Sequence, residues 1–367
     1  MDAIKLINLF NRLLSSNVLI TRKHNRLVAV TAGAFRNFFV LLLIISSTEY
    51  FLVAQFDVFK TVILYKPDVS IASSVVMYMA FMAVQLPMII SDLKNRTMVT
   101  ELCQRVLQID QDLVTCFPGL AQRRCQYWWI KLELVQLTCV SIILTRRAVE
   151  MSILLSGTFG IAIVGRVLLE CLLQLRLLFG QLLVEILSSQ FDTLRRLAIP
   201  RENLHKMVYF LDELIELKML VSRAFGVQLL CGIGTTCLTC SVLTYVLLID
   251  IQLGGFDDDD IFWDCFNVTY NASNLLLLFL LCYRHDVIDD REQEFKNAIK
   301  SLQYEATEEH SEDYLNFLDL INLKLMTESP KITACGLFTV NLQVFYNVFA
   351  AIVTYIMILF QFRDFEK

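Results

Sequence analysis

The sequence predicts an all-α, polytopic membrane protein with seven transmembrane helices, a cytoplasmic N-terminus, an extracellular C-terminus and long cytoplasmic helical extensions. Three observations support this class. Of the 367 residues, 56% are hydrophobic and only 19% are charged, whereas roughly 25% are charged in an ordinary soluble domain. The hydrophobic residues form long continuous runs, and most of the basic residues lie between alternate runs. Membrane lipid is therefore the expected surrounding of much of the chain.

Seven segments are long enough to span a bilayer, because a helix needs about 20 mostly apolar residues to cross the hydrocarbon core. The strands of a membrane barrel would alternate apolar and polar residues over about ten positions, and these runs are apolar all round. We therefore expect helices. Their residue ranges are 38–56, 69–91, 126–145, 151–176, 224–249, 261–283 and 332–362.

The orientation follows from the basic residues, since loops rich in Lys and Arg stay on the cytoplasmic side. With the N-terminus inside, the inner segments hold 23 of the 32 Lys and Arg residues. The connection between the fifth and sixth spans contains no basic residue and carries four consecutive aspartates, 257–260. Two glycosylation sequons follow, at Asn267 and Asn271, and they favour an outer location and a glycoprotein.

The chain is expected to form one domain, residues 1–367, whose spans continue into the cytosol. The inner helical extensions cover about 92–125, 177–223 and 284–331. In these segments Leu, Ile and Phe recur every three or four positions among charged residues, which is typical of half-buried amphipathic helices. We expect the extensions to pack on one another.

The last span is uncharged over thirty-one residues, about 46 Å as a single helix against a hydrocarbon core of about 30 Å. A break or a protrusion is therefore expected, and Gly336 is one place for a break. Five polar residues lie within an arc of roughly 80° on this helix. They are Thr339, Gln343, Asn347, Thr354 and Gln361. Such a stripe indicates a pore wall or hydrogen bonds between packed helices, and geometry alone favours the hydrogen bonds.

The end of this span carries a specific pattern. Residues 354–362 read Thr-Tyr, five apolar residues and Gln-Phe, which resembles the C-terminal signature of the insect gustatory receptor family. The stretch 335–338, Cys-Gly-Leu-Phe, is also similar to the start of that family's final helix. The resemblance implies a ligand-gated, non-selective cation channel in the plasma membrane of a sensory neuron. It also implies a homo- or hetero-tetramer in which one pore helix per subunit, about 339–362, surrounds a central path for permeant cations.

The resemblance assigns roles to individual positions. Gln361 and Phe362 match the family positions that close the pore, and Thr354 and Tyr355 match the pair that holds the final helix against its neighbours. The stripe adds Gln343 and Asn347 to the expected pore wall. Sugar receptors of this family usually have glutamate after Thr-Tyr, where this chain has Ile356. The expected ligand is thus a small tastant other than a sugar, detected for acceptance or avoidance.

Candidate ligand contacts come from the outer halves of the spans, where aromatic, hydroxyl and one carboxylate side chain suit a small organic compound. For each of them, simple packing is the alternative interpretation. A carboxylate within a span usually faces a cavity or a partner. The candidates are Glu49, Tyr78, Ser156, Tyr245, Trp263 and Tyr270.

Two other membrane classes compete with a channel. A seven-helix G-protein-coupled chemoreceptor would need the opposite topology and usually carries an Asn-Pro motif in its last span, which has no proline here. A secondary transporter should show repeats with matching helix breaks, and none is evident. We expect no catalytic residues, metal or cofactor, since the four histidines all lie in inner segments without an acid–nucleophile arrangement. A net charge of −5 gives no reason to expect nucleic acid.

Overall fold

The computed structural model describes residues 3–13, 18–23, 26–31, 69–117, 128–155, 157–196, 204–252, 261–304, 312–326 and 329–365. The first expected span, 38–56, lies outside these residues. The aspartates 257–260 also lie outside them.

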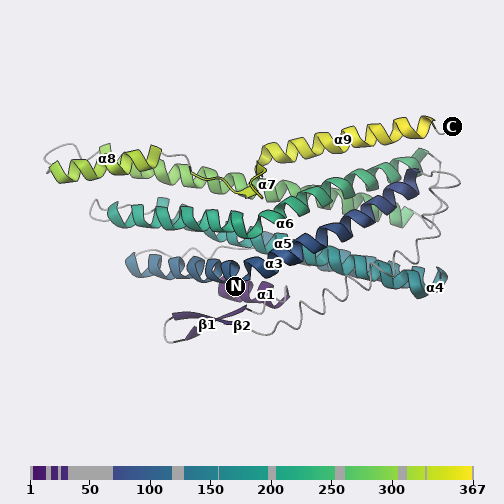
Figure 1. Cartoon of the computed structure of the whole chain (residues 1–367), viewed down its shortest axis with the longest axis horizontal. Coiled ribbons are helices and arrows are strands. Elements are labelled where there is room, and N and C mark those ends of the chain that lie inside the picture. The colour runs from purple at the N-terminus through teal and green to yellow at the C-terminus, as the bar shows by residue number, and fades with distance from the viewer. Residues whose placement is uncertain are drawn as a thin grey trace.

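Long helices that run side by side dominate the molecule (Figure 1). α4 packs along α5, α3 along α6, and α7 against both α5 and α6. α9 lies along one edge and contacts mainly α6 and α7. The bounds are α3 Val69–Cys116, α4 Trp128–Leu155, α5 Gly157–Arg195, α6 Leu204–Gln252, α7 Ile261–Tyr304, α8 Glu312–Met326 and α9 Leu342–Phe365. The helices α3, α5, α6 and α7 each continue without interruption from an expected span into an expected inner extension.

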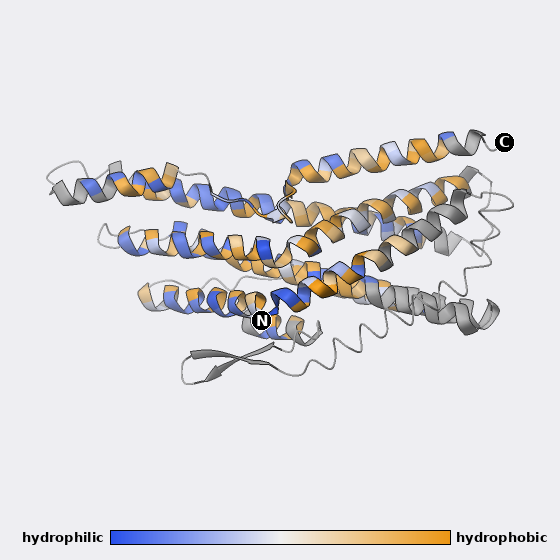
Figure 2. Ribbon diagram, viewed as in Figure 1, coloured by the Kyte–Doolittle hydropathy of each residue, from blue (hydrophilic) through white to orange (hydrophobic). Residues whose placement is uncertain are grey.

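The two ends of this bundle differ in character. Figure 2 shows mostly hydrophobic residues in one half and a mixture of hydrophobic and hydrophilic residues in the other. The mixed half holds much of the buried core, including Leu102, Leu182, Leu214 and Phe295, each fully buried. Among the described residues, four helical segments are long and apolar enough to cross a membrane: Glu170–Arg195, Leu204–Ile249, Cys265–Lys300 and Leu342–Gln361.

A small N-terminal unit covers one side of the core. α1 (Ala3–Leu13) is followed by an antiparallel hairpin of β1 (Val18–Lys23) and β2 (Arg26–Thr31). Leu6, Ile7 and Phe10 are buried, and the ring of Phe10 stacks on Phe179 of α5 with 5.7 Å between centroids. The all-α expectation did not include this hairpin.

Two expected boundaries were wrong. Residues 146–150, expected as an outer loop, are helical, and α4 continues to Leu155 because no Gly or Pro interrupts it. The last helix begins at Leu342 rather than near Ile332. It is preceded by a hairpin of β3 (Thr333–Ala334) and β4 (Phe338–Thr339). The expected break at Gly336 is confirmed, since Cys335 and Gly336 have positive φ values of 54° and 74°.

Candidate functional site

The segment before α9 is held tightly against α6. The backbone N–H of Thr333 donates a hydrogen bond to Ser222 Oγ at 2.9 Å. At Gly226, on the next turn of α6, a Cβ atom would lie only 2.9 Å from the backbone nitrogen of Cys335. Glycine is therefore required at this position if the hairpin is to approach α6 so closely.

Two side chains cap the start of α9. Asn341 Oδ1 accepts a hydrogen bond from the N–H of Val344 at 3.1 Å, and Asp286 Oδ2 of α7 accepts one from the N–H of Leu342 at 2.9 Å. The first N–H groups of a helix have no partner within the helix, so these bonds fix where α9 begins and attach it to α7. The expected pore helix of 339–362 is corrected accordingly: Thr339 lies in β4 and leaves the polar stripe. An Asn directly before an apolar run is a helix-start signal that identifies Asn341.

The remaining stripe residues lie on the exposed side of α9. Gln343, Asn347, Thr354 and Gln361 are all exposed, while Ile352, Ile356 and Leu359 are buried on the other side. Gln343 donates to Asn347 Oδ1 at 3.1 Å, and Thr354 donates to the carbonyl oxygen of Ala350 at 2.9 Å. Within the described part of the chain, none of these four side chains hydrogen-bonds to another helix. The stripe does not join α9 to any other helix that the structure describes.

The signature residues fall on both sides of α9. Tyr355 is half-buried, and the neighbouring Ile356 packs in an apolar cluster with Cys240 and Ile352. The ring of Phe360 meets Tyr245 of α6 edge-on, with 5.5 Å between centroids. Phe362 lies within α9, but its side chain is outside the described part of the structure.

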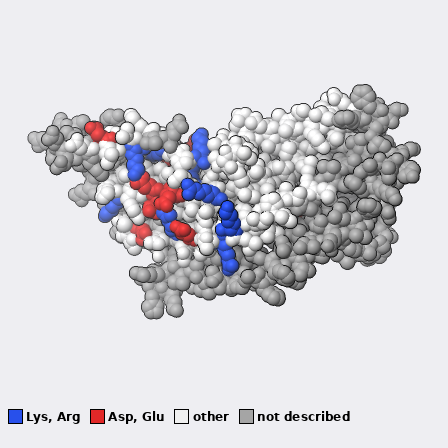
Figure 3. Space-filling view, in the orientation of Figure 1, with Lys and Arg blue, Asp and Glu red and all other residues white. Residues whose placement is uncertain are grey.

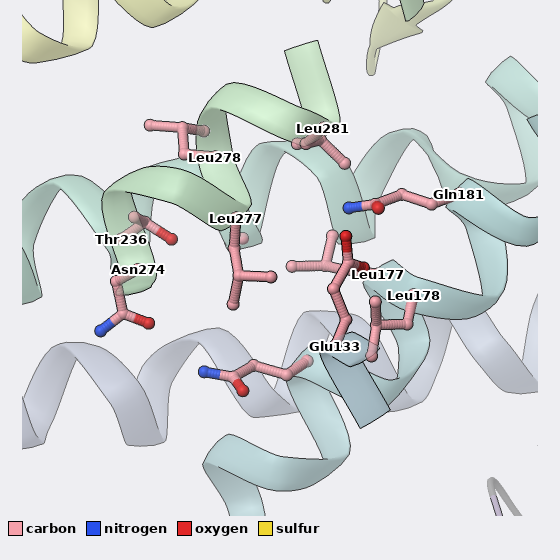
Figure 4. Close-up of a pocket in the computed structure, with 11 residues that line it drawn as sticks. Glu133, Leu177, Leu178, Gln181, Thr236, Asn274, Leu277, Leu278 and Leu281 are labelled. Atoms are coloured by element: carbon pink, nitrogen blue, oxygen red, sulfur yellow. The ribbon is translucent and has the colours of Figure 1, made fainter. Parts of the chain in front are cut away.

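A cavity of about 50 Å³ lies between α4, α5, α6 and α7 (Figure 4). Leucines form its middle, Thr236 and Asn274 lie at one end, and Glu133 and Gln181 point toward each other at the other end. This volume accommodates a few water molecules, whereas sites for drug-sized ligands measure roughly 300–1,000 Å³. The lining residues are Glu133, Gln174, Leu177, Leu178, Gln181, Gly232, Thr236, Asn274, Leu277, Leu278 and Leu281.

Glu133, at one end of this cavity, forms a buried ion pair. Arg284 Nη2 of α7 lies 2.9 Å from Glu133 Oε1 of α4, and both side chains are more than nine-tenths buried. Arg284 also donates to Gln181 Oε1 of α5. Three helices are thereby joined at one point, and each buried charge has a partner, as a buried charge requires.

Of the six candidate ligand residues, the structure describes the side chains of Tyr245 and Tyr270. Tyr245 is buried against α9, and Tyr270 stacks on Phe266 of the same helix. Neither lines the cavity, although Tyr270 precedes Asn274 by one helical turn. Glu49 and Ser156 lie outside the described residues, as do the side chains of Tyr78 and Trp263.

Sequence reasoning missed the cavity residues. The signal for Glu133 was its charge within an expected span. Gln181, Thr236 and Asn274 carried no pattern that separates them from other polar residues of apolar helices. Their proximity results from the packing of α5, α6 and α7.

The two sequon asparagines differ in their surroundings. Asn271 Nδ2, the atom that would carry a glycan, donates to Thr244 Oγ1 of α6 at 2.6 Å. Asn267 is half-buried near the start of α7. No group of three His, Cys, Asp or Glu residues in the described ranges is arranged to hold a metal ion.

The family model for the 7tm chemosensory receptors matches residues 12–366. The sequence matches no curated protein. The fold is similar to the insect olfactory receptor OR5 from Machilis hrabei, with a TM-score of 0.68, and to the same receptor in complex with eugenol, with a TM-score of 0.70. In both cases the identity is 14%, and the match covers 98% of this chain and 97% of the receptor chain.

Proposed function

Since this chain belongs to the 7tm chemosensory receptor family, we propose that it is a gustatory receptor that acts as a ligand-gated, non-selective cation channel. It works in the plasma membrane of a sensory neuron and mediates acceptance or avoidance of a small tastant. α9 lines the ion path, with Gln361 and Phe362 at the gate and with Gln343, Asn347 and Thr354 along the wall.

The observation that carries this proposal is the exposed polar stripe on a helix that is otherwise apolar. An amide side chain moved into an apolar medium without a hydrogen-bond partner costs about 2–7 kcal/mol. Among the described residues, the amide of Gln361 has no partner on another helix, and those of Gln343 and Asn347 bond only to each other. Contact with lipid is therefore unfavourable for this face, and a water-filled path removes the cost.

A single α9 helix cannot enclose a path, so the proposal requires several subunits around one axis. Closed rotational symmetry is the usual arrangement of copies of one chain, and a tetramer, homomeric or mixed with other receptor subunits, is proposed. Exposed apolar residues on α8 support an assembly, because Leu320 is 65% and Met326 74% exposed in the half of the molecule that is expected to lie in the cytosol.

The proposed ligand is a small, mainly apolar compound. The related olfactory receptor was solved with eugenol bound, which makes a compound of that kind a reasonable first candidate here. The cavity between α4, α5, α6 and α7 is a second candidate region for it, besides the surroundings of Tyr245 and Tyr270. A ligand larger than a few water molecules would have to displace Leu177 or Leu277 there. Ile356 supports a ligand other than a sugar, and Asn267 is the better placed of the two glycosylation candidates.

The test is a recording of currents from cells that express the full chain, with a panel of apolar aromatic compounds that begins with eugenol. G-protein signalling is blocked throughout. We expect cation currents within milliseconds of application, and we expect Gln361→Ala and Phe362→Ala to change basal leak or gating. Currents that disappear under the blockade would favour a G-protein-coupled receptor, and two variants indistinguishable from wild type would refute the pore assignment.

A further inference from the structure

Four basic residues on three segments lie at the junction between the charged and the uncharged half of the molecule (Figure 2). Figure 3 shows blue side chains that cross one face between a mixed red and blue region and a white, uncharged region. We name this group the basic band. It consists of Lys94 and Arg96 of α3, Arg223 of α6, and Lys331 of the segment before β3.

Hydrogen bonds between side chains and backbone groups bring these segments together. Asn95, between the two basic residues of α3, donates to the carbonyl oxygen of Ala224 at 3.2 Å. Ser222, next to Arg223, is bonded to Thr333, which follows Lys331 by two positions. Three stretches that are far apart in the sequence thus meet within the reach of their long side chains.

The basic band has no counter-charge among the residues that the structure describes. Other basic residues in the charged half form ion pairs, namely Arg105, Lys218, Lys296 and Lys324. None of the four band side chains forms an ion pair or hydrogen bond with any described residue. The nearby carboxylate of Asp92 is already engaged on both oxygens, by Arg176 and by Gln228, each at 2.7 Å.

The position of the basic band next to the apolar stretches indicates that its partner is a lipid headgroup. Arg223 directly precedes the apolar stretch 224–249, and Lys94 and Arg96 directly follow the apolar stretch 69–91. Phosphate groups of lipids lie at this level of a bilayer, and basic clusters just inside a membrane attract anionic headgroups. Lys94 and Arg96 point about 160° apart on α3, so one of them can face the same headgroup as Arg223 and Lys331. Three charges still exceed what a singly charged headgroup needs for neutralisation, and they match a headgroup that carries several phosphates.

We propose that the basic band binds the headgroup of a polyphosphorylated inositol phospholipid in the inner leaflet. Lys331 lies just before the hairpin that leads into α9, so a headgroup that contacts Lys331 and Arg223 together holds this segment on α6. The lipid thereby restrains the start of the proposed pore helix. Binding itself requires no channel activity, and it can be tested whether or not the proposed function is correct.

The test uses the purified full chain in phosphatidylcholine nanodiscs and measures its affinity for short-chain phosphatidylinositol bisphosphate. Each basic side chain near anionic lipid contributes roughly a fivefold gain in affinity. Arg223→Gln with Lys331→Gln should therefore weaken binding about 25-fold. The matched control is Lys206→Gln with Lys300→Gln, which removes the same charge near the far ends of α6 and α7 and should leave affinity within twofold of wild type.

Several outcomes would overturn the proposal: unchanged binding by the band variant, an equal loss in the control, or equally tight binding of short-chain phosphatidylserine. Equally tight binding of free inositol trisphosphate would assign the band to a soluble polyanion instead. If the double variant fails to fold, the single variants Lys94→Gln and Lys331→Gln, both at exposed positions, should each lose about fivefold.

Discussion

Gly226 sets how closely the segment that precedes the pore helix approaches α6. We expect Gly226→Ala to lower the stability of the protein by roughly 1–3 kcal/mol, because the added methyl group meets backbone rather than a movable side chain. The thermal unfolding midpoint of the purified protein in detergent measures this. Gly234→Ala, in the same helix and with no atom within 4 Å of the new group, should instead raise stability by about 0.5–1 kcal/mol. An equal response of the two variants would contradict the close approach.

The buried pair of Glu133 and Arg284 allows a second test with single residues. Removal of one partner of a buried ion pair leaves an uncompensated charge and typically costs about 3–5 kcal/mol. Arg284→Gln should therefore lower the unfolding midpoint strongly, and the double variant with Glu133→Gln should recover much of the loss. Unfolding curves of wild type, both single variants and the double variant form the required cycle. Additive losses would show that the pair is not coupled.

The faces of α9 make a prediction at the scale of the element. Asn347→Cys and Thr354→Cys place thiols on the polar stripe, where a charged, water-soluble thiol reagent should react and reduce the current. Phe349→Cys lies on the same helix, is also exposed at 48% in the single chain, and points about 135° away from the centre of the four stripe residues on α9. The reagent should leave the current of the Phe349→Cys variant unchanged. If the reagent reduces the current at all three positions, or at none, the assignment of α9 to the pore wall is wrong.

The long helices are the part of the fold that the sequence predicts best. The expected spans 69–91, 224–249 and 261–283 all lie within helices α3, α6 and α7, since a long apolar run leaves the backbone few other ways to satisfy its hydrogen bonds in lipid. The start of α9 was harder to predict, because it depends on contacts with Ser222, Gly226 and Asp286 more than fifty positions away. Glu133 and Asn274 were not predicted to line one cavity for the same reason, since they lie on different helices, α4 and α7.

The topology concerns the whole molecule and can be tested with native cysteines. Cys265, near the expected outer end of α7, and Cys116, at the expected inner end of α3, are both exposed. Burial raises the pKa of the Cys103 thiol to about 12, so this residue should stay unreactive. A membrane-impermeant maleimide should label intact cells at Cys265, and Cys265→Ser should remove that label. Labelling of Cys116 on intact cells would show that the orientation in the membrane is the opposite of the expected one.

The central claim is that the chain itself encloses an ion path along α9. Single-channel currents of the purified protein in planar bilayers, with the active compound from the ligand panel, test this most directly. We predict cation-selective openings without any other protein. Gln361→Glu should raise the cation conductance and Gln361→Lys should lower it, because a charge at the pore wall changes the local cation concentration in opposite directions. The absence of current from the purified chain, or equal conductance of the two variants, would contradict the account.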